Sequence, residues 1–201
     1  MPKPEIETKL PILNQAAFEA RLRELGFRID TPRTFEHNTL YDTPSRDLRA
    51  RTEILRIRRY GDTWTLTHKR LADSASISDP TRYKTRIETE TTIADGEALG
   101  HIFEHLGYKP AFTYEKYRTE WSHPSEPHAY LVIDETPIGI YAELEGSPDW
   151  IDRTVTQLGI DPATCLTDSY GKLFIDWKQR TGSPADNLTF AEIAPALASV
   201  E

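Results

Sequence analysis

The chain has 201 residues, with 24 basic and 32 acidic side chains, and its formal net charge is −8. The acidic balance argues against a general nucleic-acid-binding protein, which carries a basic excess, and no stretch approaches the roughly 18 apolar residues that span a bilayer. A single cysteine, Cys165, rules out an intramolecular disulfide and an all-cysteine metal site. No apolar run opens the chain, so we expect one cytoplasmic domain without nucleic-acid or membrane partners.

Short segments that alternate polar and apolar residues dominate the first half of the chain and predict β-strands. Asn14 is placed to cap a helix that runs to about Leu25, because its side chain can accept a hydrogen bond from the first helical turn. The Ser-, Asp- and Pro-rich segment 71–83 is expected to be a loop. The expected strands of this half are 5–10, 35–41, 53–60, 63–70 and 84–92.

The second half of the chain adds helices to further strands. Apolar residues three and four apart predict a helix at 95–106, and two more helices are expected at 149–158 and 168–177. The expected strands are 112–121, 129–135 and 139–145. About eight strands with inserted helices predict an α+β protein built on an antiparallel or mixed barrel, covering residues 1–179. The tail, 180–201, is expected to be disordered or weakly helical.

The polar faces of these strands carry a high density of charge. Side chains at i and i+2 share one face of a strand, which pairs Glu5 with Glu7 and Arg56 with Arg58. A solvated face explains any single strand, but like charges side by side are poor choices for a purely structural surface. The strands together favour a barrel that closes with its charges inward. Carboxylates without His or Cys suit Mg²⁺ or Mn²⁺, and clustered Arg and Lys suit phosphate oxygens, so the pattern matches a metal-bound polyphosphate.

Several short motifs follow one another in an order that is typical of one family. The first is Glu5-Ile6-Glu7-Thr8-Lys9, a Glu-x-Glu-x-Lys signature. The others are Asn38-Thr39-Leu40-Tyr41-Asp42-Thr43, Leu55-Arg56-Ile57-Arg58, Thr65-Leu66-Thr67-His68-Lys69, Arg86-Ile87-Glu88-Thr89-Glu90, Glu115-Lys116-Tyr117-Arg118, Asp134-Glu135-Thr136-Pro137-Ile138-Gly139, Ala142-Glu143-Leu144-Glu145-Gly146 and Ser169-Tyr170-Gly171-Lys172-Leu173. In these motifs the sequence resembles the CYTH domain, also called the triphosphate tunnel metalloenzyme fold, over roughly residues 3–178. The resemblance implies an eight-stranded antiparallel β-barrel, a triphosphate tunnel, with flanking helices and a divalent metal ion.

The resemblance also implies a role for each charged position. Lys9 is expected to orient or deprotonate the attacking water. The expected metal ligands are Glu5, Glu7, Asp134, Glu143 and Glu145. The expected phosphate ligands are Arg56, Arg58, Lys69, Lys84, Arg86, Lys116, Arg118 and Lys172, the last brought in by a carboxy-terminal helix, and Glu88 and Glu90 are expected to line the tunnel. The family often carries an acidic residue near Asn38 or Thr39, and neither position is charged here.

The same resemblance leaves more than one activity open. We expect a triphosphatase dependent on Mg²⁺ or Mn²⁺ that acts on inorganic triphosphate, ATP or thiamine triphosphate, as a monomer or homodimer. A class IV adenylate cyclase that makes cyclic AMP from ATP shares every motif. A polyphosphate- or nucleotide-binding module without turnover is a third alternative, which the number of carboxylates disfavours. A charged barrel without a ligand is the fourth.

Overall fold

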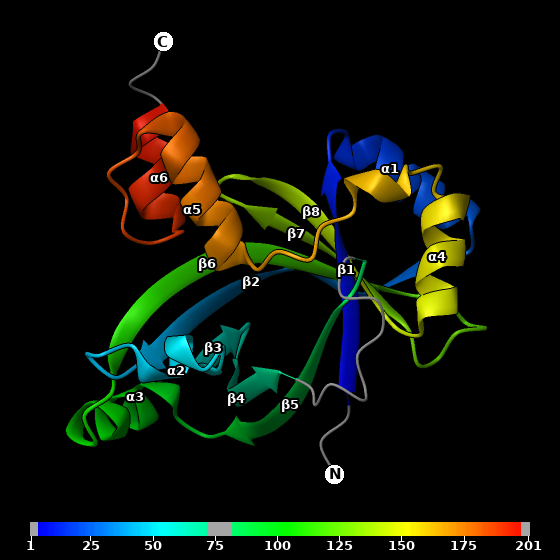
Figure 1. The fold of residues 1–201 in the computed structure, drawn as a ribbon. Helices are drawn as coiled ribbons and strands as arrows, with labels where there is room; N and C mark the ends of the chain where they lie inside the picture. Colours follow the sequence, from blue (N-terminus) through cyan, green and yellow to red (C-terminus); the bar gives the residue numbers. More distant parts are fainter. Residues whose placement is uncertain (1–3, 72–81, 198–201) are drawn as a thin grey trace.

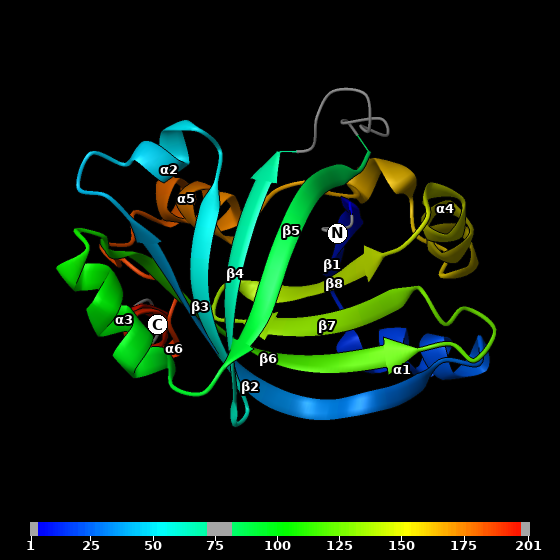
Figure 2. The ribbon, with the colours of Figure 1, turned by 90° about the horizontal axis from the view of Figure 1, so that it is seen from below.

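A closed antiparallel β-barrel forms the centre of the computed structural model, which describes residues 4–71 and 82–197 (Figure 1). Its eight strands are β1 (Pro4–Ile12), β2 (Arg28–Asp42), β3 (Ile54–Tyr60), β4 (Thr63–Leu71), β5 (Lys84–Ile93), β6 (Lys109–Ser122), β7 (Tyr130–Thr136) and β8 (Gly139–Glu145). They close in the order β1-β5-β4-β3-β2-β6-β7-β8. In Figure 2, β3, β4 and β5 cross β6, β7 and β8 at a steep angle. The predicted fold class is confirmed, whereas most of the predicted loop 71–83 lies outside the described residues.

The helices lie outside the barrel. They are α1 (Gln15–Glu24), α2 (Asp47–Ala50), α3 (Gly96–His105), α4 (Pro148–Gln157), α5 (Tyr170–Thr181) and α6 (Phe190–Leu197), with a short 3₁₀ helix at Pro162–Thr164. Asn14 caps α1 as predicted, because its Oδ1 accepts the Ala17 N–H at 3.0 Å. Helices α1 and α4 lie close together on one side of the molecule, and α5 and α6 pack beside each other on another (Figure 1). Within the described ranges, no helix is long and apolar enough to cross a membrane.

The apolar faces of the strands point outward and form the main core with the helices. Leu10, Leu131 and Leu144 on β1, β7 and β8 are fully buried there, together with Leu22 of α1 and Ile151 of α4. Because side chains alternate along a strand, packing these outer faces against helices leaves the charged faces toward the barrel interior. The hydrophobic pattern of the sequence therefore determines which side chains line the tunnel.

Two elements differ from the sequence prediction. Strand β2 begins at Arg28, well before the predicted residue 35, and pairs with β6 through register shifts between Ile29 and Thr34, around Pro32. Helix α2 follows β2 and was not predicted. Its start is held by the Asp42 carboxylate: Oδ1 accepts the Leu48 N–H and Oδ2 the Arg49 N–H. A helix of four residues is too short to show the apolar periodicity on which the helix predictions rested.

The segment after residue 180 packs against the barrel. Leu188 bridges to β6: its N–H donates to Thr113 O at 3.0 Å and its O accepts the Glu115 N–H at 2.9 Å. Strand β7 pairs with β6 only from Tyr117 onward, so this segment covers backbone that β7 does not reach. Leu188 and Ile193 are fully buried against α5. Part of the predicted tail is thus an ordered helical segment, and the domain boundary at residue 179 stays a prediction.

Candidate active site

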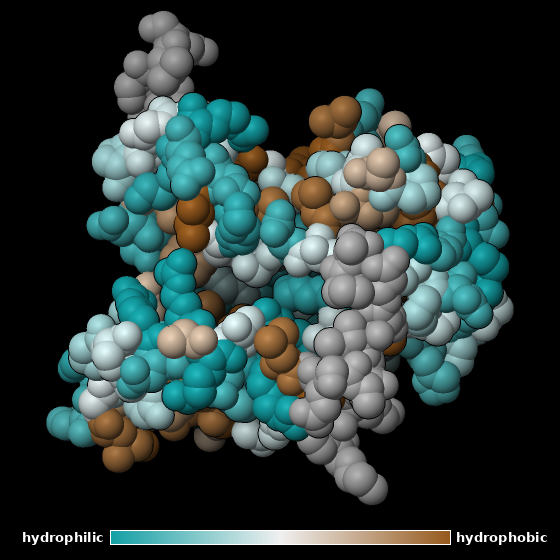
Figure 3. All heavy atoms as spheres, in the orientation of Figure 1, coloured by the Kyte–Doolittle hydropathy of each residue, from teal (hydrophilic) through white to brown (hydrophobic). Residues whose placement is uncertain are grey.

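The barrel interior encloses a cavity of about 330 Å³ that is lined mainly by charged side chains. In the space-filling view the surface is hollowed below the first turn of α5 (Figure 3). The charged residues that line the cavity are Glu5, Glu7, Lys9, Arg56, Arg58, Lys69, Lys84, Glu88, Glu90, Lys116, Arg118, Glu143 and Glu145. All of them were predicted site residues, so the strand alternation brings most of the predicted set to one place.

Two fully buried carboxylates and the two cations that pair with them form a compact group, here called the buried cluster: Glu36, Lys116, Arg118 and Asp134. The Asp134 carboxylate accepts hydrogen bonds from Lys116 Nζ at 2.8 Å and from Nε and Nη2 of Arg118, both at 2.7 Å. Glu36 adds a second carboxylate 3.4 Å from Lys116 Nζ. Glu36 and Asp134 are both fully buried. Because buried ions are tolerated only where several partners compensate their lost hydration, the two cations of the cluster are held in fixed positions.

Glu36 is a site residue that the sequence prediction missed. It is the register partner of Lys116 on β6 and accepts a hydrogen bond from Asn38 Nδ2 at 2.9 Å. Burial acts to raise the pKa of Glu36, but Lys116 and Arg118 outweigh it and lower the pKa to about 2. The signal was present in the sequence, since Glu36 lies two residues before Asn38 and so shares its face of the strand.

Asp134 was expected to bind metal, and its contacts place it elsewhere. It lies outside the cavity lining formed by the described residues. Besides Lys116 and Arg118, the Tyr170 hydroxyl donates to Asp134 Oδ2 at 2.6 Å. The carboxylate therefore lies behind the basic residues and holds them, and its role as a metal ligand stays a prediction that these contacts disfavour.

The basic residues of β3, β4 and β5 that line the cavity are here called the open wall: Arg56, Arg58, Lys69 and Lys84. Arg56 donates to two neutral hydroxyls, Tyr114 Oη and Thr67 Oγ1, both at 3.2 Å, while the nearest carboxylate, that of Glu90, is 3.7 Å away. In the part of the chain that the structure describes, the buried Arg56 Nε finds no acceptor. The Arg56 guanidinium can therefore exchange a hydroxyl partner for a phosphate group, whose oxygens accept two hydrogen bonds from a guanidinium at once.

Lys69 and Lys84 of the open wall each bind a carboxylate of β1. Lys69 Nζ lies 2.8 Å from Glu5 Oε2, and Lys84 Nζ lies 2.7 Å from Glu7 Oε1. Lys69 also lies 2.9 Å from Glu88. The carboxylates of Glu5 and Glu7 thus each point toward a lysine. Within residues 4–71 and 82–197, no three Asp, Glu, His or Cys side chains are gathered closely enough to hold a metal ion. The ion pairs with the lysines explain this spacing.

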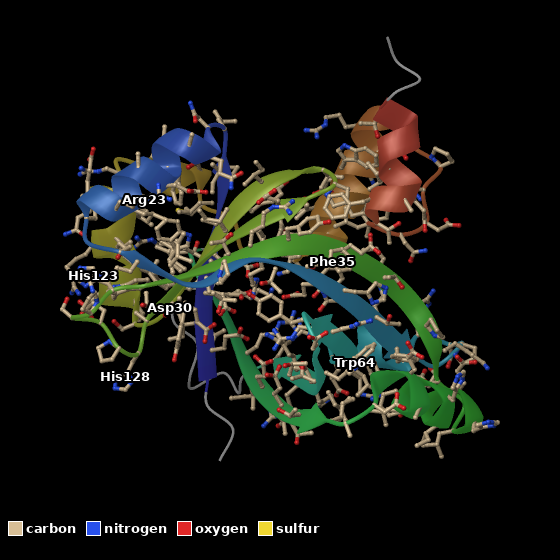
Figure 4. The ribbon with its side chains drawn as sticks, turned by 180° about the vertical axis from the view of Figure 1, so that it is seen from behind. Arg23, Asp30, Phe35, Trp64, His123 and His128 are labelled. Carbon is tan, nitrogen blue, oxygen red and sulfur yellow. The ribbon has the colours of Figure 1, made fainter. Side chains whose placement is uncertain are left out.

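The carboxylates nevertheless repel one another. Burial first, and the neighbouring Glu7 second, raise the pKa of Glu5 to about 7 and also raise the pKa of Glu145. Glu7 and Glu145 are register partners on β1 and β8. A divalent cation would relieve this repulsion, and an all-oxygen donor set suits a hard ion such as Mg²⁺, so these three residues fit the metal that the sequence predicted. His123 and His128 lie at the periphery, away from the barrel interior (Figure 4).

Lys9 lies near both the carboxylates of the cavity and Asp134 of the buried cluster, and it is almost completely buried. Its Nζ lies 2.5 Å from Glu143 Oε1. Burial acts to lower the pKa of Lys9, but Glu143 and Glu7 outweigh it and raise the pKa above the usual value. At neutral pH the side chain is therefore an ammonium ion that donates hydrogen bonds. Of the two roles predicted for Lys9, orienting a water fits this state better than deprotonating one.

Comparison with known proteins agrees with this geometry. A model of the CYTH domain matches residues 3–147. A protein of Methanocaldococcus jannaschii named "Putative adenylate cyclase" is 30% identical over 144 residues, which cover 71% of this chain and 77% of that protein. The chain belongs to the CYTH family. Enzymes of this family act on triphosphates and typically use a divalent metal ion.

Solved structures share the CYTH fold at low sequence identity. A protein from Vibrio parahaemolyticus is 17% identical and superposes with a TM-score of 0.70, covering 87% of this chain and 99% of that one. A protein from Hippeastrum, described as having a dominant triphosphatase activity, is 18% identical with a TM-score of 0.63, covering 86% of this chain and 96% of that one. At these identities the structures establish a common fold and nothing about the activity of this chain.

Besides Asp134, two residues assigned from the CYTH motifs lie outside the cavity lining in the described chain. Lys172 lies on the solvent side of α5 with 52% of its side chain exposed, and its Nζ bonds to the Asp176 carboxylate. Arg86 extends from β5 to Thr52, whose carbonyl oxygen accepts from its Nη1 at 2.9 Å. Tyr170, two residues before Lys172, enters the cavity instead. Successive helical residues are rotated by about 100°, so these two side chains point to nearly opposite sides of α5.

Proposed function

We propose that this protein hydrolyses the terminal phosphoanhydride bond of an inorganic or organic triphosphate in the presence of Mg²⁺ or Mn²⁺. One observation carries the proposal: basic side chains, among them Arg56 with its hydroxyl partners, and mutually repelling carboxylates line the same cavity. A triphosphate would offer its oxygens to the basic side chains, and its cation would relieve the repulsion between the carboxylates. Phosphoryl transfer depends mainly on positioning and on neutralising the charge of the transition state, and both requirements match this cavity.

Each group of residues would have a different role, which follows from its position in the cavity. The open wall, Arg56, Arg58, Lys69 and Lys84, would bind phosphate oxygens. Three of its side chains are more exposed than those of Lys116 and Arg118, and the fourth, Arg56, bonds to hydroxyl groups. Lys116 and Arg118 would add charge from fixed positions. Lys9 would donate a hydrogen bond to the attacking water or to a phosphate oxygen. Glu5, Glu7 and Glu145, with Glu143 beside them, would hold the divalent cation, which would neutralise phosphate oxygens.

The decisive experiment measures phosphate release from inorganic triphosphate, ATP and thiamine triphosphate with Mg²⁺ or Mn²⁺ between pH 6 and 10. Replacing Glu145→Gln should lower the metal-dependent turnover about 100-fold, an effect of about 2.7 kcal/mol on the barrier. The free energy of unfolding of this variant should not fall, because the substitution removes the repulsion between residue 145 and Glu7. The matched control is Glu135→Gln, since Glu135 pairs with Arg33 outside the barrel and should leave turnover unchanged. Release of no phosphate from any substrate would contradict the proposal.

A class IV adenylate cyclase is the second candidate. The apolar side chains Leu40, Ile54 and Phe112 line the same cavity, so an organic group has favourable contacts beside the charged residues. The name of the Methanocaldococcus jannaschii relative points the same way. Mass analysis of the products from ATP separates the candidates, because a cyclase makes cyclic AMP and pyrophosphate whereas a triphosphatase makes ADP and phosphate.

A further inference from the structure

Tyr170 contacts three charged side chains, and the activity proposed above gives it no role. Its hydroxyl donates to Asp134 Oδ2 at 2.6 Å. Its ring centroid lies 4.5 Å from Lys9 Nζ and 4.9 Å from Lys116 Nζ, so one aromatic ring contacts two ammonium groups. Tyr170 is itself buried, with 7% of its surface exposed, and both lysines are 3% exposed. Cation–π contacts gain most where the cation has lost its water, which is the situation of both lysines.

The hydroxyl of Tyr170 keeps its proton. Burial first, and the Asp134 carboxylate second, raise the pKa of Tyr170 well above 10. The side chain is therefore a neutral donor at working pH. It donates to Asp134 Oδ2, and the same carboxylate oxygen accepts from Lys116 and Arg118.

The ring is held by helix α5 and by two strands of the barrel, β6 and β8. Tyr170 is the first residue of α5, which is capped by Ser169, and its ring packs against Tyr114 and Tyr141 with centroids 6.0 and 5.9 Å apart. Helix α5 is in turn covered by the segment that contains Leu188 and Ile193. None of these carboxy-terminal residues falls within residues 3–147, which the CYTH model matches. The carboxy-terminal segment thus completes the wall of the cavity.

We propose that Tyr170 is a positioning residue that holds the ammonium groups of Lys9 and Lys116 in the geometry that binds a triphosphate. Lys9 Nζ is bonded to Glu143, and Lys116 Nζ is bonded to Asp134 with Glu36 3.4 Å away. Without the aromatic ring, each ammonium group is free to move around its carboxylate, and Lys116 can shift toward Glu36. The proposal rests on the triphosphate site proposed above, but it requires binding only and no turnover.

The test is calorimetric binding of inorganic triphosphate to the full chain and to three variants. Tyr170→Leu should weaken binding at least tenfold, while the stoichiometry stays that of the wild type. Tyr170→Phe keeps the aromatic face and should restore the affinity to within about threefold. The matched control is Phe174→Leu: Phe174 is a buried aromatic residue of the same helix that stacks on Phe112 and Trp177. This control should stay within threefold of the wild type.

The outcomes separate positioning from general stability and from the proposed function. Partial unfolding lowers the stoichiometry, whereas lost positioning lowers the affinity. The proposal is overturned if Tyr170→Leu binds as tightly as the wild type, or if Phe174→Leu loses affinity equally. It is also overturned if Tyr170→Phe is as weak as Tyr170→Leu, because the hydroxyl would then be the active group. A wild type that binds triphosphate without turnover contradicts the proposed hydrolysis alone, and a wild type that does not bind it contradicts both.

Discussion

The buried cluster and the open wall contribute to the same tunnel but pair their charges in different ways. In the buried cluster, Asp134 accepts hydrogen bonds from Lys116, Arg118 and Tyr170 at 2.6–2.8 Å. In the open wall, Arg56 donates to neutral hydroxyls, and its carboxylate neighbours Glu88 and Glu90 are 3.9 and 3.7 Å away. The first arrangement fixes cations in place, whereas the second leaves them available for an incoming anion.

This difference follows from burial. Fully buried charges must be paired closely, because separating them in a medium of low polarity is expensive. Charges with some access to water can be paired loosely at little cost, and the side chains of Glu88 and Glu90 beside Arg56 are 22% and 35% exposed, compared with 0% for Asp134. Mutations in the buried cluster should therefore mainly affect stability, and mutations in the open wall should mainly affect substrate binding.

The largest expected effect is on the buried cluster. Replacing Asp134→Ala leaves Lys116 and Arg118 with an uncompensated buried charge and should lower the free energy of unfolding by about 3–5 kcal/mol. Urea denaturation measures the change. The matched control is Glu90→Ala in the tunnel, whose side chain is 35% exposed and pairs with Arg58, and which should cost less than about 1 kcal/mol. Equal losses in the two variants would show that the two regions do not differ in this way.

The contrast also explains what the sequence could and could not predict. Alternation fixes which face of each strand is charged, so residues such as Glu7, Arg56 and Glu143 were predicted correctly as neighbours. Glu36 could have been found by the same rule, from its phase relative to Asn38. Lys172 and Tyr170 could not, because the rotation of a helix about its axis is set by packing with distant segments. For α5 that packing involves Phe112 and Tyr141, which are remote in the sequence.

The second prediction concerns the acid side of the stability profile. The pKa of Glu36 is about 2 in the folded protein, because Lys116 and Arg118 outweigh the effect of burial, and the ordinary value is 4.5. A carboxyl group with a lowered pKa stabilises the fold above its unfolded pKa, and this contribution is lost as the pH falls toward the folded value. It should amount to something on the order of 3 kcal/mol. The difference in unfolding free energy between the wild type and Glu36→Gln should therefore shrink from pH 4.5 to pH 2. A difference that stays constant over this range would contradict the assignment.

The smallest expected effect is on the open wall and concerns binding. Replacing Arg56→Ala removes a guanidinium whose hydrogen bonds go to hydroxyl groups, so the fold should lose little stability. The KM for inorganic triphosphate should rise about tenfold, which corresponds to about 1.4 kcal/mol, since a charge-assisted bidentate contact with phosphate is lost. Steady-state kinetics together with a urea titration measure both quantities. The matched control is Arg59→Ala: Arg59 lies on the opposite face of β3, about half exposed beside Asp62, and should leave KM unchanged. If Arg56→Ala instead unfolds the protein as readily as Asp134→Ala, Arg56 belongs with the buried cluster and the open wall is smaller than its geometry indicates.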